Sequence, residues 1–160
     1  MTAAPTPATR PSSGDAPSPA VASRLSNRLL GTLVAGAGLS VLLVAARLNP
    51  DPRGYGTHTQ LGLPPCPWVI APGRPCPTCG MTTAFAHAAH GHFLDAFRAH
   101  PLGLVLALTA AAGFWVGLHA AFTGSRVLSV CGKLLTPKVL WTAAALWGAS
   151  WAYKVFFWTV

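Results

Sequence analysis

Apolar residues gather in three long stretches that are separated by polar, Pro-rich or basic segments. Residues 29–46 and 102–122 contain no charged side chain, and helices of this length, at 1.5 Å per residue, cross about 30 Å of hydrocarbon. The third stretch, residues 139–159, is interrupted by Lys154. This lysine lies among aromatic residues suited to a membrane–water interface, where its charge can extend toward water. The pattern predicts three transmembrane helices.

The amino-terminal segment differs from these stretches in composition. Residues 1–23 combine Pro, Ser, Thr and Ala with almost no bulky apolar side chain, so burial cannot offset the entropy lost on ordering. We therefore expect a disordered tail at 1–23 and a helical membrane domain at 24–160. The first apolar stretch follows too long a polar region for the core of a secretory signal, and we interpret it as an uncleaved anchor.

Residues 47–100, between the first two apolar stretches, divide into a loop and a helical part. Eight prolines and five glycines in residues 47–80 predict a stiff, irregular loop. Residues 81–97 then have apolar side chains at helical spacing, and Gly91 can end a first helix within them. Three histidines and an aspartate in this part are costly in hydrocarbon. We therefore expect a short amphipathic helix at the membrane interface, not a fourth span.

Composition supports a lipid-solvated chain. Only 9% of the residues are charged, 52% are hydrophobic, and there is no glutamate, whereas a water-soluble domain has roughly a quarter of its residues charged. The sequence therefore predicts an all-α membrane protein with about three transmembrane helices and a short amphipathic interfacial helix after a Cys- and Pro-rich loop. Its lipid partner is the bilayer of the cell membrane, which the chain crosses several times.

The basic residues indicate an orientation and not a nucleic-acid surface. The net charge is +8, but the cations are spread singly and form no basic patch, so we expect no nucleic-acid partner. Slightly more cations near the span ends belong to the tail and the 123–138 connection than to the opposite side. By the positive-inside rule, this places the amino terminus in the cytoplasm.

Three cysteines and a histidine form the strongest candidate site. Cys76 and Cys79 are two residues apart, a spacing at which one metal ion can bind both. Cys66 precedes them in the loop, and His87 or His90 on the following helix can complete four ligands. Pro77 stiffens the turn and Gly80 can adopt a left-handed conformation. A zinc site of Cys66, Cys76, Cys79 and His87 is one hypothesis.

The same thiols support two other interpretations. A thiol at the start of a helix has its thiolate stabilised by free N–H groups, so Cys76 and Cys79, with Cys66 as a third thiol, fit a membrane thiol–disulfide oxidoreductase. Alternatively, one disulfide braces the loop against the helix. Small residues in the apolar stretches, including Gly113 and Gly117, predict close helix packing, either within the chain or in a homo-oligomer.

The motif as a whole resembles that of a widespread bacterial family of membrane proteins of unknown function. The resemblance covers about residues 61–122 and rests on the order C-P…P-C-P-x-C-G-x-T-R/T-A, which here runs from Cys66 through Cys76, Cys79 and Thr82. Many members have Arg where this chain has Thr83, and usually Asn where it has His100. The resemblance implies a multi-span helical protein and directs attention to Cys66, Cys76, Cys79 and Thr82, but it implies no reaction.

Taken together, these features predict a membrane accessory or partner-binding protein that is not an enzyme. Its cysteines form a structural motif, held by zinc or a disulfide. Its protein partner is a second copy of the chain or another membrane protein. The alternative is the thiol–disulfide oxidoreductase, and a metal carrier that uses the histidines is a third class.

Overall fold

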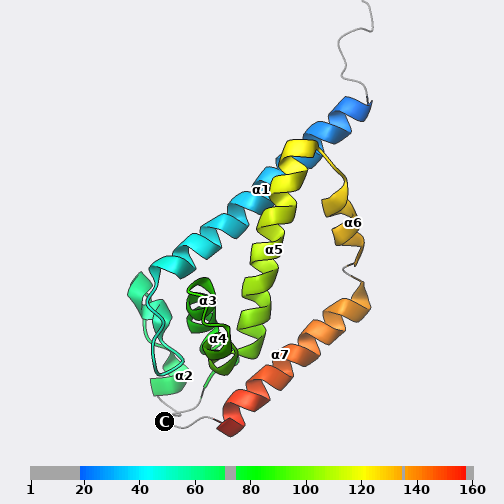
Figure 1. Cartoon of the computed structure of the whole chain (residues 1–160). Coiled ribbons are helices and arrows are strands. Elements are labelled where there is room, and N and C mark those ends of the chain that lie inside the picture. The colour runs from blue at the N-terminus through cyan, green and yellow to red at the C-terminus, as the bar shows by residue number, and fades with distance from the viewer. Residues whose placement is uncertain (1–18, 71–74, 135, 158–160) are drawn as a thin grey trace, which may run out of the picture.

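The computed structural model describes residues 19–70, 75–134 and 136–157. The regular elements of this part of the chain are all helices, with no strand among them, as predicted. The long helices are α1 (Pro19–Arg47), α5 (Pro101–Thr123) and α7 (Pro137–Phe157). The shorter elements are the 3₁₀ turn η1 (Thr57–Leu61), α2 (Pro67–Ile70), α3 (Met81–Ala89), α4 (Phe93–Ala99) and α6 (Val127–Leu134), all shown in Figure 1.

Helix α1 begins earlier than the sequence pattern indicates. The predicted tail ended at residue 23, but α1 starts at Pro19, so residues 19–23 are helical; the rest of the predicted tail, residues 1–18, lies outside the described residues. Proline is favoured in the first turn of a helix, because its missing N–H would have no intrahelical partner there. Composition alone could not locate the start of α1, since Pro, Ser and Ala occur both in flexible linkers and in the first turn of helices.

Small residues bring α1 and α5 together along their lengths. A Cβ atom added at Gly117 would lie 2.7 Å from the backbone nitrogen of Ala35, and one added at Gly31 would lie 2.6 Å from that of Ala121. No larger residue fits at either glycine while the backbones stay so close. At Gly113, in contrast, no described atom lies within 4 Å of such a Cβ. The predicted packing role is therefore met inside the chain by Gly31, Ala35 and Gly117.

Two helices are long and apolar enough to cross a membrane, namely residues 23–47 of α1 and the whole of α5. Only 17% of the most apolar part of each is buried within the molecule, which differs from the core helix of a water-soluble protein. Leu33 and Trp115, for example, are 70% and 67% exposed. The outward faces of α1 and α5 are thus apolar surfaces.

The third predicted span is a helix, but it is less apolar than α1 and α5. Helix α7 covers the described part of residues 139–159 and is not among the described helices that are apolar enough to span. Its tryptophans, Ser150 and Lys154 lower its hydropathy. In Figure 1, α7 diverges from α5 and approaches it only near the start of α5. Helix α6, which the sequence analysis did not predict, occupies the expected connection at 123–138.

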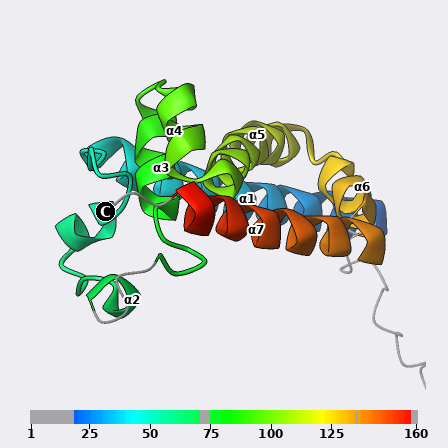
Figure 2. The ribbon, with the colours of Figure 1, turned by 90° about the horizontal axis from the view of Figure 1, so that it is seen from below.

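Helices α3 and α4, which form the short helical part predicted after the loop, cap the start of α5. Gly91, with φ at 80°, separates them. Their core consists of alanines, and a Cβ added at Gly103 of α5 would lie 2.8 Å from that of Ala84. The 47–80 loop, predicted to be irregular throughout, contains the single turns η1 and α2. Figure 2 shows this loop gathered with α3 and α4 at one end of the molecule and α6 at the other.

Candidate metal centre

Three thiols meet at the amino-terminal end of α3. Cys66 immediately precedes α2, while Cys76 and Cys79 lie in the turn before α3. The three sulfur atoms are all within 4.8 Å of one another. Cys79 is buried and the other two are half-buried. The structure therefore brings together three of the four residues that the sequence analysis proposed as ligands; we call them the thiol group.

A tight turn holds Cys76 and Cys79 in place. The backbone N–H of Cys79 donates to the carbonyl of Cys76 (3.0 Å), and that of Met81 donates to Thr78 (3.1 Å). Gly80 follows with φ at 85°, and a Cβ there would lie 2.6 Å from the carbonyl oxygen of Gly54 and 2.7 Å from that of Ala99. Gly80 is thus required both for its left-handed backbone and for the close approach of two other segments.

The two cysteines of the turn have opposite acidities. Burial, and then the neighbouring Cys76, raise the pKa of Cys79 to about 11, although the charge of Lys154 opposes the rise. Burial also acts to raise the pKa of Cys76, but hydrogen bonds from the side chain and backbone of Thr78 and from the other two thiols outweigh it and lower the pKa. Of these two cysteines, Cys76 is therefore the one that ionises first.

His100 connects the cysteine turn to both α5 and α7. Its Nδ1 accepts from the backbone N–H of Gly103 (3.1 Å), which leaves the ring hydrogen on Nε2, where it is donated to the carbonyl of Pro77 (3.2 Å). The hydroxyl of Ser150 donates to the same Nδ1 (3.2 Å). His100 lies between two helices, a position that is often solvated, but its side chain is only 1% exposed. It is the N-cap of α5.

Two residues of α7 that the sequence analysis did not assign to the site also hold the loop. Trp151 donates its indole N–H to the carbonyl of Pro75 (3.3 Å), and the Lys154 ammonium donates to that of Gly54 (3.2 Å). We expected Lys154 to extend toward water, but it is buried, at 8% exposure. A signal was present in the sequence, since Ser150 and Lys154 lie four residues apart on one face of an otherwise apolar helix.

Thr83 occupies the position where the resembling proteins often carry Arg. Its hydroxyl lies 2.8 Å from that of Thr57, and both residues are fully buried. The Thr57 hydroxyl also accepts from the backbone N–H of Asp51 (3.1 Å). Where the resembling proteins often have a charged Arg, this chain therefore has an uncharged threonine, Thr83, whose hydrogen bond to Thr57 connects α3 with the loop.

An apolar cavity of about 750 Å³ adjoins the thiol group. One wall is the carboxyl-terminal half of α1, and the others are the loop and the start of α3. All three cysteines line it, as do His58 and Thr82, the latter being the threonine that the motif singles out. The volume lies in the range of small-molecule sites, which are mostly apolar with a few polar groups.

His87, the fourth ligand proposed from the sequence, belongs to a different group. The structure places it with His92 and Asp95 at the far end of α3, and the sulfur group does not include it. His87 lies six positions, or about 9 Å of helix, beyond Met81, which is at the end of α3 next to the thiols. His90 hydrogen-bonds through Nδ1 to the carbonyl of Ala86 (2.7 Å).

Comparison with protein families agrees with the resemblance read from the motif. Residues 66–114 match the family described as "Protein of unknown function (DUF2752)". The matched segment begins at Cys66, includes the whole thiol group with α3 and α4, and ends within α5. It covers less than half of the chain. No curated protein and no solved structure matches the chain.

Proposed function

We propose that this chain is an integral membrane protein in which Cys66, Cys76 and Cys79 bind one zinc ion, and that the site serves a structural or partner-binding role. The observation that carries the proposal is the meeting of three sulfurs within 4.8 Å at the junction of the loop, α3 and the helical pair. Zinc accepts thiolates about 2.3 Å away, so two of its tetrahedral ligands lie about 3.8 Å apart. Three thiols already this close need only a small contraction.

The fourth ligand, on this proposal, comes from the cavity. All three cysteines line the cavity, and His87 lies too far along α3 to join them. Zinc with three protein ligands keeps one position for water or for a donor from another molecule. A partner that supplies this donor would be held at the loop face, which agrees with an accessory protein that binds another membrane protein.

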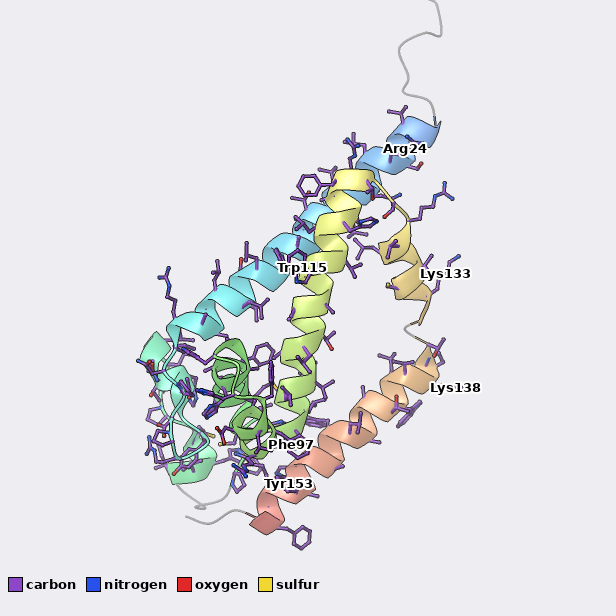
Figure 3. The ribbon with its side chains drawn as sticks, in the orientation of Figure 1. Arg24, Phe97, Trp115, Lys133, Lys138 and Tyr153 are labelled. Atoms are coloured by element: carbon purple, nitrogen blue, oxygen red, sulfur yellow. The ribbon has the colours of Figure 1, made fainter. Side chains whose placement is uncertain are left out.

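The membrane part of the proposal rests on α1 and α5. Both are long and apolar enough to cross, and their outward faces are exposed. We propose α7 as a third span whose polar groups are satisfied by His100, which bonds to Ser150, and by the loop, which bonds to Trp151 and Lys154. Arg24 and Lys133 lie at the end of the molecule opposite Phe97 and Tyr153 (Figure 3), and the positive-inside rule favours the cytoplasm for the Arg24 end.

Metal analysis of the untagged chain purified in detergent tests the zinc site. After dialysis that removes solvent-exchanging metal, we expect about one zinc ion per chain to remain. It should be lost in Cys76→Ser and retained in Cys131→Ser, which removes the exposed thiol of α6. A wild-type protein without zinc whose intact mass shows two hydrogens fewer, restored by reductant, would instead establish a disulfide brace. Zinc retained in full by Cys76→Ser would also overturn the proposal.

A second candidate function, thiol–disulfide exchange, is favoured by the unequal acidity of Cys76 and Cys79. The Cys76 thiolate attacks a substrate disulfide, forms a mixed disulfide and releases one substrate thiolate, which takes up a proton. The Cys79 thiol, on losing its proton, then attacks the Cys76 sulfur and releases the second substrate thiol. Two electrons pass to the substrate, and a Cys76–Cys79 disulfide remains.

Trapping the mixed disulfide distinguishes this candidate from the zinc site. Reduced, metal-free protein is mixed with glutathione disulfide as the probe. We expect a Cys66→Ser/Cys79→Ser double variant, which lacks both neighbouring thiols, to accumulate glutathione on Cys76, while the wild type releases two glutathiones and gains an internal disulfide. Cys131→Ser serves as the control and should behave as the wild type. If Cys76 reacts no faster than the exposed Cys131, the oxidoreductase interpretation fails.

A further inference from the structure

A second group of metal-ligating side chains lies where α3 meets α4. It consists of His87, His92 and Asp95, and one ligand atom from each lies within 4.8 Å of the others. The two imidazole rings have centroids 6.1 Å apart and are tilted by 57°. Two imidazoles and one carboxylate form a donor set that suits zinc and other divalent transition metals.

The turn between the helices creates this group. His87 lies in the last turn of α3, and Gly91, with φ at 80°, reverses the chain behind it. The backbone N–H of His92 donates to the carbonyl of His87 (2.9 Å), which fixes the two residues side by side. Asp95 lies in the first turn of α4 and faces the same point. Residues five and eight positions beyond His87 are thereby brought to its side chain.

The ligand atoms are available for coordination. Nδ1 of His87 is shielded from solvent and has no hydrogen-bond partner among the described residues. A buried polar atom without a partner is unfavourable, and a metal bond or a bound water would relieve it. Burial also lowers the pKa of His87, which keeps the imidazole neutral, the form that binds metals. Asp95 makes an exposed ion pair with Arg98 (3.2 Å), which a metal ion can displace.

We propose that His87, His92 and Asp95 bind a divalent transition-metal ion, zinc by donor type, with water as the remaining ligand. This site is separate from the thiol group, because about 9 Å of α3 lies between His87 and Met81, whereas zinc bonds are only about 2.0–2.3 Å long. His92 and Asp95 are exposed, so the ion exchanges with solvent. The proposal does not depend on metal at the cysteines.

Cobalt(II) is the probe that separates the two sites in the full-length, untagged protein. Sulfur-bound cobalt gives intense near-ultraviolet charge-transfer absorption, whereas cobalt bound only by imidazole and carboxylate gives weak visible bands. We expect the protein to bind one cobalt ion that produces no sulfur-to-cobalt charge-transfer absorption, and we expect zinc to displace this ion. It should persist when Cys66, Cys76 and Cys79 are all replaced by Ser. In the wild type, a sulfur signal would then report the thiol group independently.

Substitutions at the exposed ligands decide the proposal. We expect His92→Ala and Asp95→Asn each to weaken the binding of this cobalt ion by about tenfold or more. The matched control is His90→Ala, which removes an exposed histidine of the same turn outside the group and should leave the affinity unchanged. Equal weakening by His90→Ala would indicate unspecific binding to a histidine-rich surface and overturn the proposal. The proposal would also be overturned if His92→Ala bound cobalt as tightly as the wild type. It would be overturned too if the variant without Cys66, Cys76 and Cys79 bound no cobalt.

Discussion

His100 is a single side chain that connects three segments far apart in sequence. Its ring binds the carbonyl of Pro77 in the cysteine turn, the N–H of Gly103 in α5 and the hydroxyl of Ser150 in α7. The resembling proteins usually have Asn here, which is a favoured N-cap residue. Imidazole Nδ1 serves as the same kind of acceptor, so the cap is kept while the longer ring reaches two further partners.

Replacing His100 therefore tests how much this connection stabilises the fold. We expect His100→Ala to lower the free energy of unfolding by roughly 2–4 kcal/mol, because it removes the cap and leaves buried polar groups without a partner. His100→Asn keeps the cap and should lose only about 1 kcal/mol. Thermal or denaturant unfolding in detergent measures both. Equal losses in the two variants would mean that the cap itself adds nothing.

Protonation of His100 gives the stability a pH dependence. Burial lowers its pKa below the ordinary 6.5, while the hydrogen bond to Pro77 opposes this. Between the folded and the unfolded pKa, the unfolded chain binds more protons, so stability falls as the pH drops below about 6.5, with a limiting slope of about 1.4 kcal/mol per pH unit. His87, whose pKa is also lowered, adds to the fall. The free energy of unfolding is measured between pH 5 and 8 for the wild type and for His100→Asn. It should fall less steeply with decreasing pH in the variant, and identical slopes would contradict this prediction.

At the scale of residues, the thiols could be predicted from local spacing, whereas the buried polar groups could not. Cys76, Cys79 and Gly80 are neighbours in sequence, so one turn determines their geometry. The burial of His100 and Lys154 depends instead on the approach of α7. Its Ser150, which contacts His100, lies fifty residues later in the sequence. His87 fits the spacing of a fourth ligand, but the helix that carries it leads away from the thiols.

At the scale of elements, α1 and α5 are held together by close backbone contact at small residues more than by the packing of large side chains. In lipid, the hydrophobic effect does not drive apolar helices together, so close backbone contact and van der Waals packing must do so. Gly31 and Gly117 provide this contact, since a Cβ on either would lie under 3.0 Å from backbone atoms of the facing helix. Flexible side chains cannot relieve such a clash, because the facing atoms are main chain.

Two glycines one turn apart on α5 make a matched test. We expect Gly117→Ala to destabilise the protein by about 1–3 kcal/mol, because the helices must separate to admit the methyl group. Gly113→Ala should be neutral or stabilising by up to about 1 kcal/mol, since no described atom is near and alanine favours the helix. Unfolding in detergent measures both. If Gly113→Ala instead dissociates an oligomer, Gly113 contacts a second copy.

The element boundaries show where a hydropathy pattern has its limits. The stretches at 29–46 and 102–122 lie inside α1 and α5, because length and apolarity together specify a helix that can span. The pattern missed residues 19–28 of α1 and all of α6, which are helical without being continuously apolar. Helix α7 was predicted, but its Trp151 and Lys154 make hydrogen bonds to the loop that hydropathy does not describe.

At the scale of the whole molecule, the antiparallel pair of α1 and α5 separates two chemically different ends. The loop, the cysteines, α3 and α4 lie at the end where α1 stops and α5 starts (Figure 1). Arg24 lies at the other end (Figure 3), as does α6 (Figure 2), which carries Lys133 and the exposed Cys131. The 23 residues of α5 correspond to about 34 Å of helix, which is close to the hydrocarbon thickness of a bilayer.

This arrangement predicts that Cys76 and Cys131 lie on opposite sides of the membrane. We expect a membrane-impermeant maleimide added to intact cells, after chelation of metal, to label a variant that retains only Cys76 and to spare one that retains only Cys131. The reason is that the positive-inside rule places the Arg24 and Lys133 end in the cytoplasm. Both variants should label after detergent is added, which is the control for reactivity. Labelling of Cys131 alone would reverse the orientation, and equal labelling of both in intact cells would show that α5 does not span the bilayer.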